Sequence, residues 1–106
     1  MSNLTLKEIQ NLYGISRRAI QGYEKEGLVY STSKNKYGHL LYDENMVDRM
    51  RRIKILQDVG CTVKQIKEII NSPQEEMRCV LKDKIAKLES DKKRIDALIE
   101  LVNKTF

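Results

Sequence analysis

A pair of short amphipathic segments separated by a glycine fills residues 5–28 and limits the possible folds more than any other feature. Thr5 and Glu8 form a T-x-x-E pattern, which is typical of a helix that begins directly after the threonine. Gly14 suits the end of that helix, because the residue after a helix often takes a positive φ. The sequence therefore predicts a first helix between Thr5 and Gly14.

The second segment begins and ends with equally clear signals. Ser16 is a good N-cap, and Gly27 closes a helix that runs to about residue 26. Two helices joined by a short turn with glycine form a helix-turn-helix. The apolar positions that we expect to pack the two helices together are Ile9, Leu12, Ile15, Ile20 and Tyr23. Arg17 and Arg18 fall in the first turn of the second helix, and guanidinium groups suit phosphates and guanine edges.

Length and charge set broad limits on the function. With 106 residues, the chain has room for one small domain and one appended element. The net charge of +5 is mildly basic and permits nucleic-acid binding. Residues 1–73 hold 12 Lys and Arg against 8 Asp and Glu, whereas residues 74–106 hold 8 against 7. Most of the positive excess therefore belongs to the part with the helix-turn-helix.

The cysteine content and the length of the apolar runs indicate the cellular location of the protein. Cys61 and Cys79 are too few for a disulfide framework, and the N-terminus has no signal-peptide pattern. No apolar run approaches the roughly 18 residues that a membrane span needs. We therefore expect a cytoplasmic protein with no membrane contact.

The segment after the second helix is rich in Tyr, Ser and Thr, and it favours a small hairpin. The predicted strands are residues 29–30 and residues 40–42, around a polar, basic tip. An irregular solvated loop is the alternative. A hairpin that follows a helix-turn-helix is a wing, and its tip would bring Lys34, Lys36 and His39 to a phosphate backbone.

Two further helices are predicted in the middle of the chain. Asp43 suits the N-cap of a helix that ends at Gly60. Its core stripe is Val47, Met50, Ile53 and Leu56, and its other faces carry Arg49, Arg51, Arg52 and Lys54. These basic residues either form a solvated face or contact DNA. Thr62 with Gln65 begins the next helix, which ends near Asn71 and has Val63, Ile66, Ile69 and Ile70 as its buried stripe.

The last third of the chain predicts one long helix. Ser72 as N-cap and Pro73 at the first helical position mark its start, and no Gly or Pro follows before the C-terminus. A heptad seam runs along it through Leu81, Ile85, Leu88, Lys92, Ile95, Ile99, Val102 and Phe106. At about 1.5 Å per residue the helix is roughly 50 Å long. This length favours an intermolecular coiled coil over the alternative, an amphipathic helix that lies on its own small domain.

Lys92 also indicates the direction of this coiled coil. In a parallel pair, Lys92 would meet its own copy in the seam, with like charges together. An antiparallel pair would set Lys92 against Leu88 or Ile95 of the second copy, where its ammonium group can reach solvent. We therefore expect an antiparallel homodimer.

The order helix-turn-helix, wing, helix pair and long helix resembles the MerR family of bacterial transcription regulators from about residue 4 to residue 70. The motifs that carry the resemblance are Gly14-Ile15-Ser16, Tyr23-Glu24-Lys25-Glu26-Gly27-Leu28, Tyr42-Asp43-Glu44 and Ile53-Lys54-Ile55-Leu56-Gln57-Asp58-Val59-Gly60. The resemblance implies a homodimer held by an antiparallel coiled coil, with the second helix in the major groove and the wing on the backbone. Activators of the family bend and untwist promoter DNA, which makes RNA polymerase a further candidate partner.

This chain departs from the family pattern at the DNA-facing positions. Gln21 and Gly22 stand where the family has Arg and an aromatic residue. Gln21 can read adenine by a bidentate contact, but it cannot neutralise a phosphate. The wing returns through Gly38-His39-Leu40 instead of Gly-Tyr-Arg, so a phosphate-contacting Arg is missing. We therefore expect a different sequence preference from that of familiar members.

We expect neither a metal nor another cofactor. Cys79 lies near the start of the long helix, where metal-sensing members place one ligand, but those members need more thiolates from a loop beyond the helix. Cys61 suits the core. His39 is the only histidine, so one chain holds no His-based metal cluster or catalytic pair. The chain is therefore predicted not to be an enzyme.

The complete prediction is a mainly α protein with a winged helix-turn-helix over residues 1–72 and a dimerisation helix over residues 73–106. It would bind promoter DNA as a homodimer and distort it. The predicted DNA-contacting residues are Ser16, Arg17, Arg18, Gln21, Tyr23, Lys34, Lys36 and His39, with Tyr23 chiefly supporting the helix. Two alternatives are an excisionase-like or architectural DNA-binding protein without effector, and a coiled-coil adaptor that recruits a partner protein.

Overall fold

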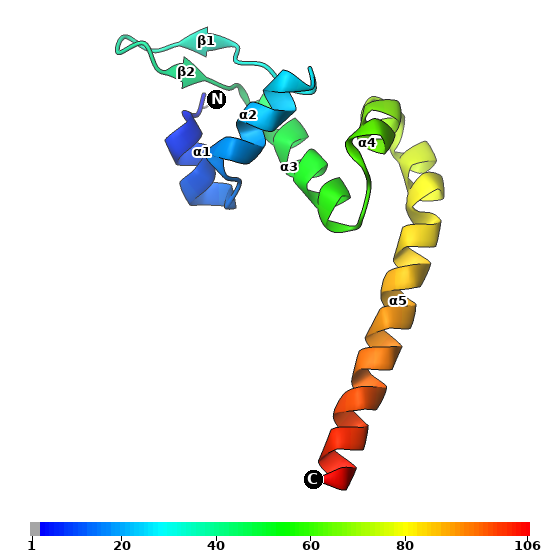
Figure 1. Ribbon diagram of the computed structural model, residues 1–106. Coiled ribbons are helices and arrows are strands. Elements are labelled where there is room, and N and C mark those ends of the chain that lie inside the picture. The colour runs from blue at the N-terminus through cyan, green and yellow to red at the C-terminus, as the bar shows by residue number, and fades with distance from the viewer. Residues whose placement is uncertain (1–2) are drawn as a thin grey trace. The chain divides into compact units, whose positions relative to one another are not determined.

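The computed structural model describes residues 3–106, and its elements follow the predicted order (Figure 1). They are α1 (Leu6–Tyr13), α2 (Arg17–Lys25), β1 (Ser33–Lys34), β2 (Leu40–Leu41), α3 (Glu44–Asp58), α4 (Val63–Ile69) and α5 (Gln74–Thr105). This confirms the predicted fold class, which is mainly α with a winged helix-turn-helix, a helix pair and a long C-terminal helix. The chain forms two compact units, with the division after Asp58. None of the helices in the described residues is long and apolar enough to cross a membrane.

Local capping starts and ends α1 and α2 where the sequence predicts. The Thr5 hydroxyl accepts a hydrogen bond from the Glu8 N–H at 3.2 Å, and the Glu8 carboxylate accepts one from the Thr5 N–H at 3.1 Å. The Ser16 hydroxyl accepts from the Ala19 N–H at 3.0 Å. Gly14 has a φ of +68°, in the left-handed region where other residues are strained. These contacts satisfy N–H groups that a helix start otherwise leaves without partners.

One core holds the first unit together. Its buried side chains are Ile9, Ile15, Ile20, Tyr23, Leu28, Val29, Tyr42, Val47, Met50, Ile53 and Leu56. The prediction that Leu12 joins them is wrong, because its side chain is 63% exposed. Helix α1 has eight residues and buries only Ile9, so the side chain one turn later already lies at the surface.

The wing is a two-stranded antiparallel hairpin, with Ser33 opposite Leu41 and Lys34 opposite Leu40. The hairpin prediction is therefore confirmed over the alternative of an irregular loop. The position of its first strand was predicted wrongly at residues 29–30. Val29 is 2% exposed and belongs to the core, so pairing begins only after the chain has left it.

The returning strand is also shorter than predicted. Tyr42 lies beyond β2 and instead forms an isolated bridge with Leu4, with both backbone N–H···O distances at 2.9 Å. This bridge joins the segment before α1 to the base of the wing. It fixes the wing to the helix-turn-helix through backbone contacts that no local pattern encodes.

Helix α3 begins as predicted. The Asp43 carboxylate accepts a hydrogen bond from the Met46 N–H at 2.9 Å, which caps the helix. All four residues of the predicted stripe, Val47, Met50, Ile53 and Leu56, are buried. The last helical residue is Asp58, shortly before Gly60 with its φ of +99°.

The second unit contains α4 and α5. Thr62 and Gln65 cap α4 reciprocally, at 3.2 Å and 2.9 Å, as predicted. The prediction that Ser72 caps α5 is wrong, because Pro73 is the N-cap and no side chain caps this helix. The Ser72 N–H donates instead to the Ile69 carbonyl at 2.9 Å, so Ser72 closes the turn that ends α4.

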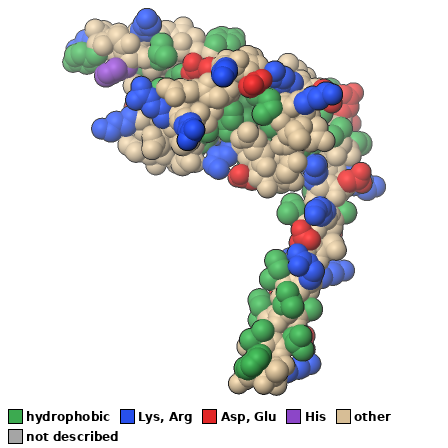
Figure 2. All heavy atoms as spheres, in the orientation of Figure 1, with side chains coloured by type: hydrophobic (Ala, Val, Ile, Leu, Met, Phe, Trp, Pro, Cys, Tyr) green, Lys and Arg blue, Asp and Glu red, His purple; other side chains and the backbone are tan. Residues whose placement is uncertain are grey.

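Helix α5 has 32 residues, and Met77 is its one buried residue. Its apolar seam is exposed: Ile85, Leu88, Ile95, Ile99 and Val102 show between 47% and 55% of their surface. Figure 2 shows hydrophobic side chains, in green, along the long helix. About half of the surface of each of these side chains is therefore exposed.

Candidate nucleic-acid interface

The first turns of α2 place polar and basic side chains at the surface. Arg17 and Arg18 are the first two helical residues, and both are exposed. Gln21 follows one turn after Arg17 on the exposed side. The Ser16 side chain lies at the same end, where its oxygen caps the helix. The start of α2 therefore presents two guanidinium groups and one amide to a ligand.

Two buried tyrosines link α2 to neighbouring segments by hydrogen bonds. Tyr23 is 5% exposed, and its hydroxyl donates a hydrogen bond to the Gln57 side chain at 2.8 Å. Burial, with a smaller contribution from the charge of Asp58, raises the pKa of Tyr23. The Tyr42 hydroxyl donates to the Glu24 carboxylate, and burial followed by this bond raises the pKa of Tyr42 as well. Both phenols therefore stay protonated at neutral pH and hold α2 against α3 and the wing base.

The tip of the wing is shaped by one asparagine. The Asn35 side-chain oxygen accepts hydrogen bonds from the N–H groups of Tyr37 at 2.9 Å and His39 at 3.0 Å. Gly38 has a φ of +81°, which closes the turn. Lys34 on β1 and Lys36 in the turn are exposed, and the Lys36 ammonium lies 5.1 Å from the Tyr37 ring centre. The tip is thus a preformed turn with two lysines and a histidine on it.

The basic residues of α3 are each engaged within the first unit. Arg49 donates to the Leu28 carbonyl at 2.5 Å, and the Arg51 guanidinium lies 4.6 Å from the Tyr13 ring centre. Two ion pairs are formed within α3, by Arg52 with Asp48 at 3.1 Å and by Lys54 with Asp58 at 3.5 Å. The sequence left open whether these residues form a solvated face or contact DNA, and the structure gives each of them an intramolecular partner.

The basic residues of α2 and the wing differ from those of α3 in that they form no ion pairs among the described residues. Within residues 3–106, no ion pair is formed by Arg17, Arg18, Lys34 or Lys36. Their positive charges are therefore not neutralised by neighbouring carboxylates. Unpaired cations on one surface attract a polyanion.

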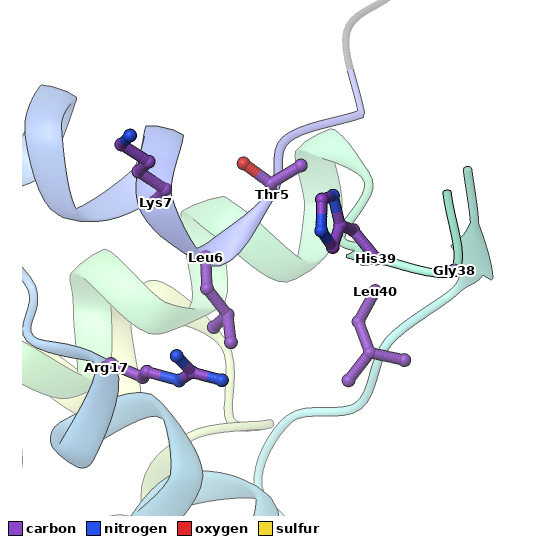
Figure 3. A pocket seen from close by; sticks show the side chains of 7 residues that line it. All are labelled: Thr5, Leu6, Lys7, Arg17, Gly38, His39 and Leu40. Atoms are coloured by element: carbon purple, nitrogen blue, oxygen red, sulfur yellow. The ribbon is translucent and has the colours of Figure 1, made fainter. Parts of the chain in front are cut away.

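A hollow of about 380 Å³ lies between the helix-turn-helix and the wing (Figure 3). It is lined by Thr5, Leu6, Lys7, Arg17, Gly38, His39 and Leu40. It brings together two predicted site residues, Arg17 and His39, from segments that are far apart in sequence. Lys7 and the two leucines were not predicted as site residues, and no local sequence signal marks them, because only the folded wing creates the hollow.

The two cysteines lie in different environments. Cys61 is buried, as predicted, and Cys79 is exposed on α5. Among the described residues, no group of three or more His, Cys, Asp and Glu side chains is arranged to hold a metal ion.

A helix-turn-helix followed by a basic wing defines a winged helix-turn-helix protein. The chain belongs to the MerR HTH family of regulatory proteins, whose family model matches residues 4–72. It is 23% identical over 101 residues to the HTH-type transcriptional activator mta of Bacillus subtilis, with 95% of this chain and 39% of that protein covered. It is 27% identical to the mercuric resistance operon regulatory protein of Bacillus cereus, with 86% and 71% covered.

Solved structures share this fold. The TM-score is 0.71, at 17% identity, with HiNmlR, a MerR family regulator that lacks the sensor domain and is bound to promoter DNA. The alignment covers 97% of this chain and 86% of that one. The transcriptional regulator SkgA from Caulobacter crescentus gives a TM-score of 0.69 at 25% identity, with 99% and 76% covered. The chain thus has the fold of these regulators, although it spans well under half the length of the Bacillus subtilis activator.

Proposed function

We propose that this chain is a transcription regulator that binds double-stranded promoter DNA through α2 and the wing. The observation that carries the proposal is that four exposed cations on α2 and the wing form no ion pair within residues 3–106. The basic residues of α3 have intramolecular partners, whereas Arg17, Arg18, Lys34 and Lys36 remain without ion pairs on the exposed parts of α2 and the wing. In helix-turn-helix proteins the start of the second helix enters the major groove.

The roles of the individual residues follow from their chemistry. Arg18 is assigned to a guanine edge and Gln21 to an adenine edge, since these side chains form bidentate contacts with those bases. Lys34, Lys36 and His39 on the wing are assigned to phosphates. Ser16 and Tyr23 act mainly by holding α2 in place, through the helix cap and the bond to Gln57.

The relatives support this role. The protein of Bacillus subtilis is named a transcriptional activator and that of Bacillus cereus an operon regulatory protein, and HiNmlR is bound to promoter DNA in its structure. The proposed activity is regulatory and not enzymatic, and the proposed location is the cytoplasm.

The exposed seam of α5 supports a homodimer. An antiparallel coiled coil of two copies would cover Ile85, Leu88 and Ile95, and it would place Lys92 beside apolar residues and not beside its own copy. Residues 73–106 then serve dimerisation and residues 1–72 serve DNA binding. Two copies of α2 would read two half-sites, and distortion of the promoter between them would act on RNA polymerase.

Binding titrations with specific and scrambled duplexes test the proposal. Arg18→Ala is expected to cost about 1–3 kcal/mol of binding free energy and to relax the preference at one base position. Lys34→Ala is expected to weaken binding to all sequences alike and to lower the salt slope by roughly 1 per lost phosphate contact. The proposal fails if wild-type protein shows no preference for any duplex, or if Arg18→Ala keeps both the affinity and the preference.

A further inference from the structure

The two arginines that begin α2 differ in their position relative to the hollow beside the wing. Arg17 lines it, together with Leu6 of α1 and Leu40 of β2, whereas Arg18 does not. In Figure 3 the side chains of Leu6, Arg17 and Leu40 face the space between them, whereas the Lys7 side chain points away from it. One residue step on the helix therefore turns Arg17 toward the wing and leaves Arg18 outside the hollow.

We propose that this hollow seats one sugar–phosphate unit of the DNA backbone, with Arg17 as a phosphate clamp and not as a base reader. The inference rests on the proposed DNA-binding function. It assigns the contact with the backbone to Arg17 and leaves the reading of bases at this end of α2 to Arg18.

The lining suits an amphipathic anion. Leu6 and Leu40 form apolar walls that a deoxyribose ring can contact, and Arg17 offers donors that match phosphate oxygens. His39 and Lys7 add basic side chains from the wing and from α1. The volume of about 380 Å³ falls within the range of roughly 300–1,000 Å³ that sites for small organic groups occupy.

No acidic side chain lines the hollow among the described residues. The nearest carboxylate in sequence, that of Glu8, accepts hydrogen bonds from the Thr5 N–H and hydroxyl, both at 3.1 Å. The charge of the lining is thus positive, and the hollow adjoins both elements of the proposed interface. These two facts favour the DNA backbone as its occupant over a neutral small molecule.

The replacements of Arg17 distinguish a clamp from a base reader. Arg17→Ala is expected to weaken binding about tenfold on specific and scrambled duplexes alike and to lower the salt slope by roughly 1 for each hollow. Arg17→Lys is expected to recover part of the affinity on both duplexes alike, because an ammonium group still binds a phosphate as a point charge. Arg52→Ala removes the same charge from α3, outside the hollow, and is the matched control.

Duplexes with one neutral methylphosphonate at each backbone position in turn locate the contact. Wild type is expected to lose affinity at one position in each half-site, and Arg17→Ala is expected to be insensitive at that same position. The inference is overturned if Arg17→Ala changes the base preference, if Arg17→Lys behaves like Arg17→Ala, or if the methylphosphonate profile is unchanged. If one of these results is found while Arg18→Ala still relaxes the base preference, the role of the hollow is wrong but the DNA-binding function stands. Should wild type bind no duplex, both proposals fail.

Discussion

Helices α3 and α5 carry the same kind of apolar stripe and have opposite environments. The stripe of α3, from Val47 to Leu56, exposes at most 5% of any side chain. The stripe of α5, from Ile85 to Val102, exposes 47% or more of each apolar side chain named in the seam. Periodic apolar residues therefore identify which face of a helix is to be covered, but not whether the cover comes from the same chain.

The basic residues of α3 also differ from those of α2 and the wing, in whether neighbouring groups engage them. The basic residues of α3 are engaged by carboxylates, a carbonyl and an aromatic ring within the first unit. The basic residues at the start of α2 and on the wing have no carboxylate partner among the described residues. The first unit thus buries the stripe of α3 and leaves cations without carboxylate partners, whereas the stripe of α5 remains about half exposed.

The largest expected effect comes from charging the seam of α5. Leu88→Glu combined with Ile95→Glu is expected to raise the dimer dissociation constant by ~1,000-fold or more, about 4 kcal/mol, because two carboxylates would enter an apolar interface. Light scattering over a range of protein concentrations measures this. Ser90→Glu with Ala97→Glu adds the same charges at the same spacing outside the seam, and this control should stay dimeric. A dimer that persists in the seam variant would refute the coiled coil.

The next largest effect comes from single side-chain truncations, which should destabilise the stripes of α3 and α5 in different ways. Ile53→Ala is expected to cost about 2–5 kcal/mol of unfolding free energy at any protein concentration, because Ile53 is fully buried in its own unit. Ile99→Ala, on a residue that is 55% exposed, should act mainly through the dimer. Urea unfolding at two protein concentrations compares them. Equal effects that do not depend on concentration would show that α5 is stabilised within one chain.

Alkaline titration should weaken the first unit selectively. Burial and the bond to Glu24 raise the pKa of Tyr42 in the folded state above its ordinary value of 10.0, so the folded state holds the phenol proton more tightly than the unfolded chain. This stability is fully present below about pH 10 and is lost above it, at up to about 1.4 kcal/mol per pH unit. Unfolding measured from pH 8 to 11 should show the loss. Tyr42→Phe should reduce it, with Tyr23 accounting for the remainder; an unchanged slope would contradict the assignment.

The smallest effect distinguishes a capping serine from one that does not cap. Ser16→Ala is expected to cost about 1 kcal/mol, because its oxygen accepts the Ala19 N–H. Ser72→Ala should stay within about 0.5 kcal/mol, because no side chain caps α5. Thermal unfolding of both variants provides the comparison. A larger cost at Ser72 would restore the capping role that the sequence predicts.

The sequence by itself determined the helices and most of their boundaries. The caps at Thr5, Ser16, Asp43 and Thr62 formed where predicted. A cap joins a side chain to an N–H group three residues away, so neighbouring residues decide it. The stripe of α3 was equally readable, because helical periodicity places those residues on one face whatever covers them.

Only the tertiary structure decided the features that depend on distant residues. Val29 lies in the core and moves the first strand to Ser33, and Tyr42 pairs with Leu4 instead of extending the wing. The same holds for the site. Arg49 and Arg51 contact the Leu28 carbonyl and the Tyr13 ring, which are far from them in sequence. Arg17 and Arg18 form no ion pair within residues 3–106. The ion pairs of Arg52 and Lys54 are local, because each joins residues one helical turn apart. Burial, the contacts of Arg49 and Arg51, and the hollow beside Arg17 depend on segments that meet only in three dimensions, which is why no local pattern could specify them.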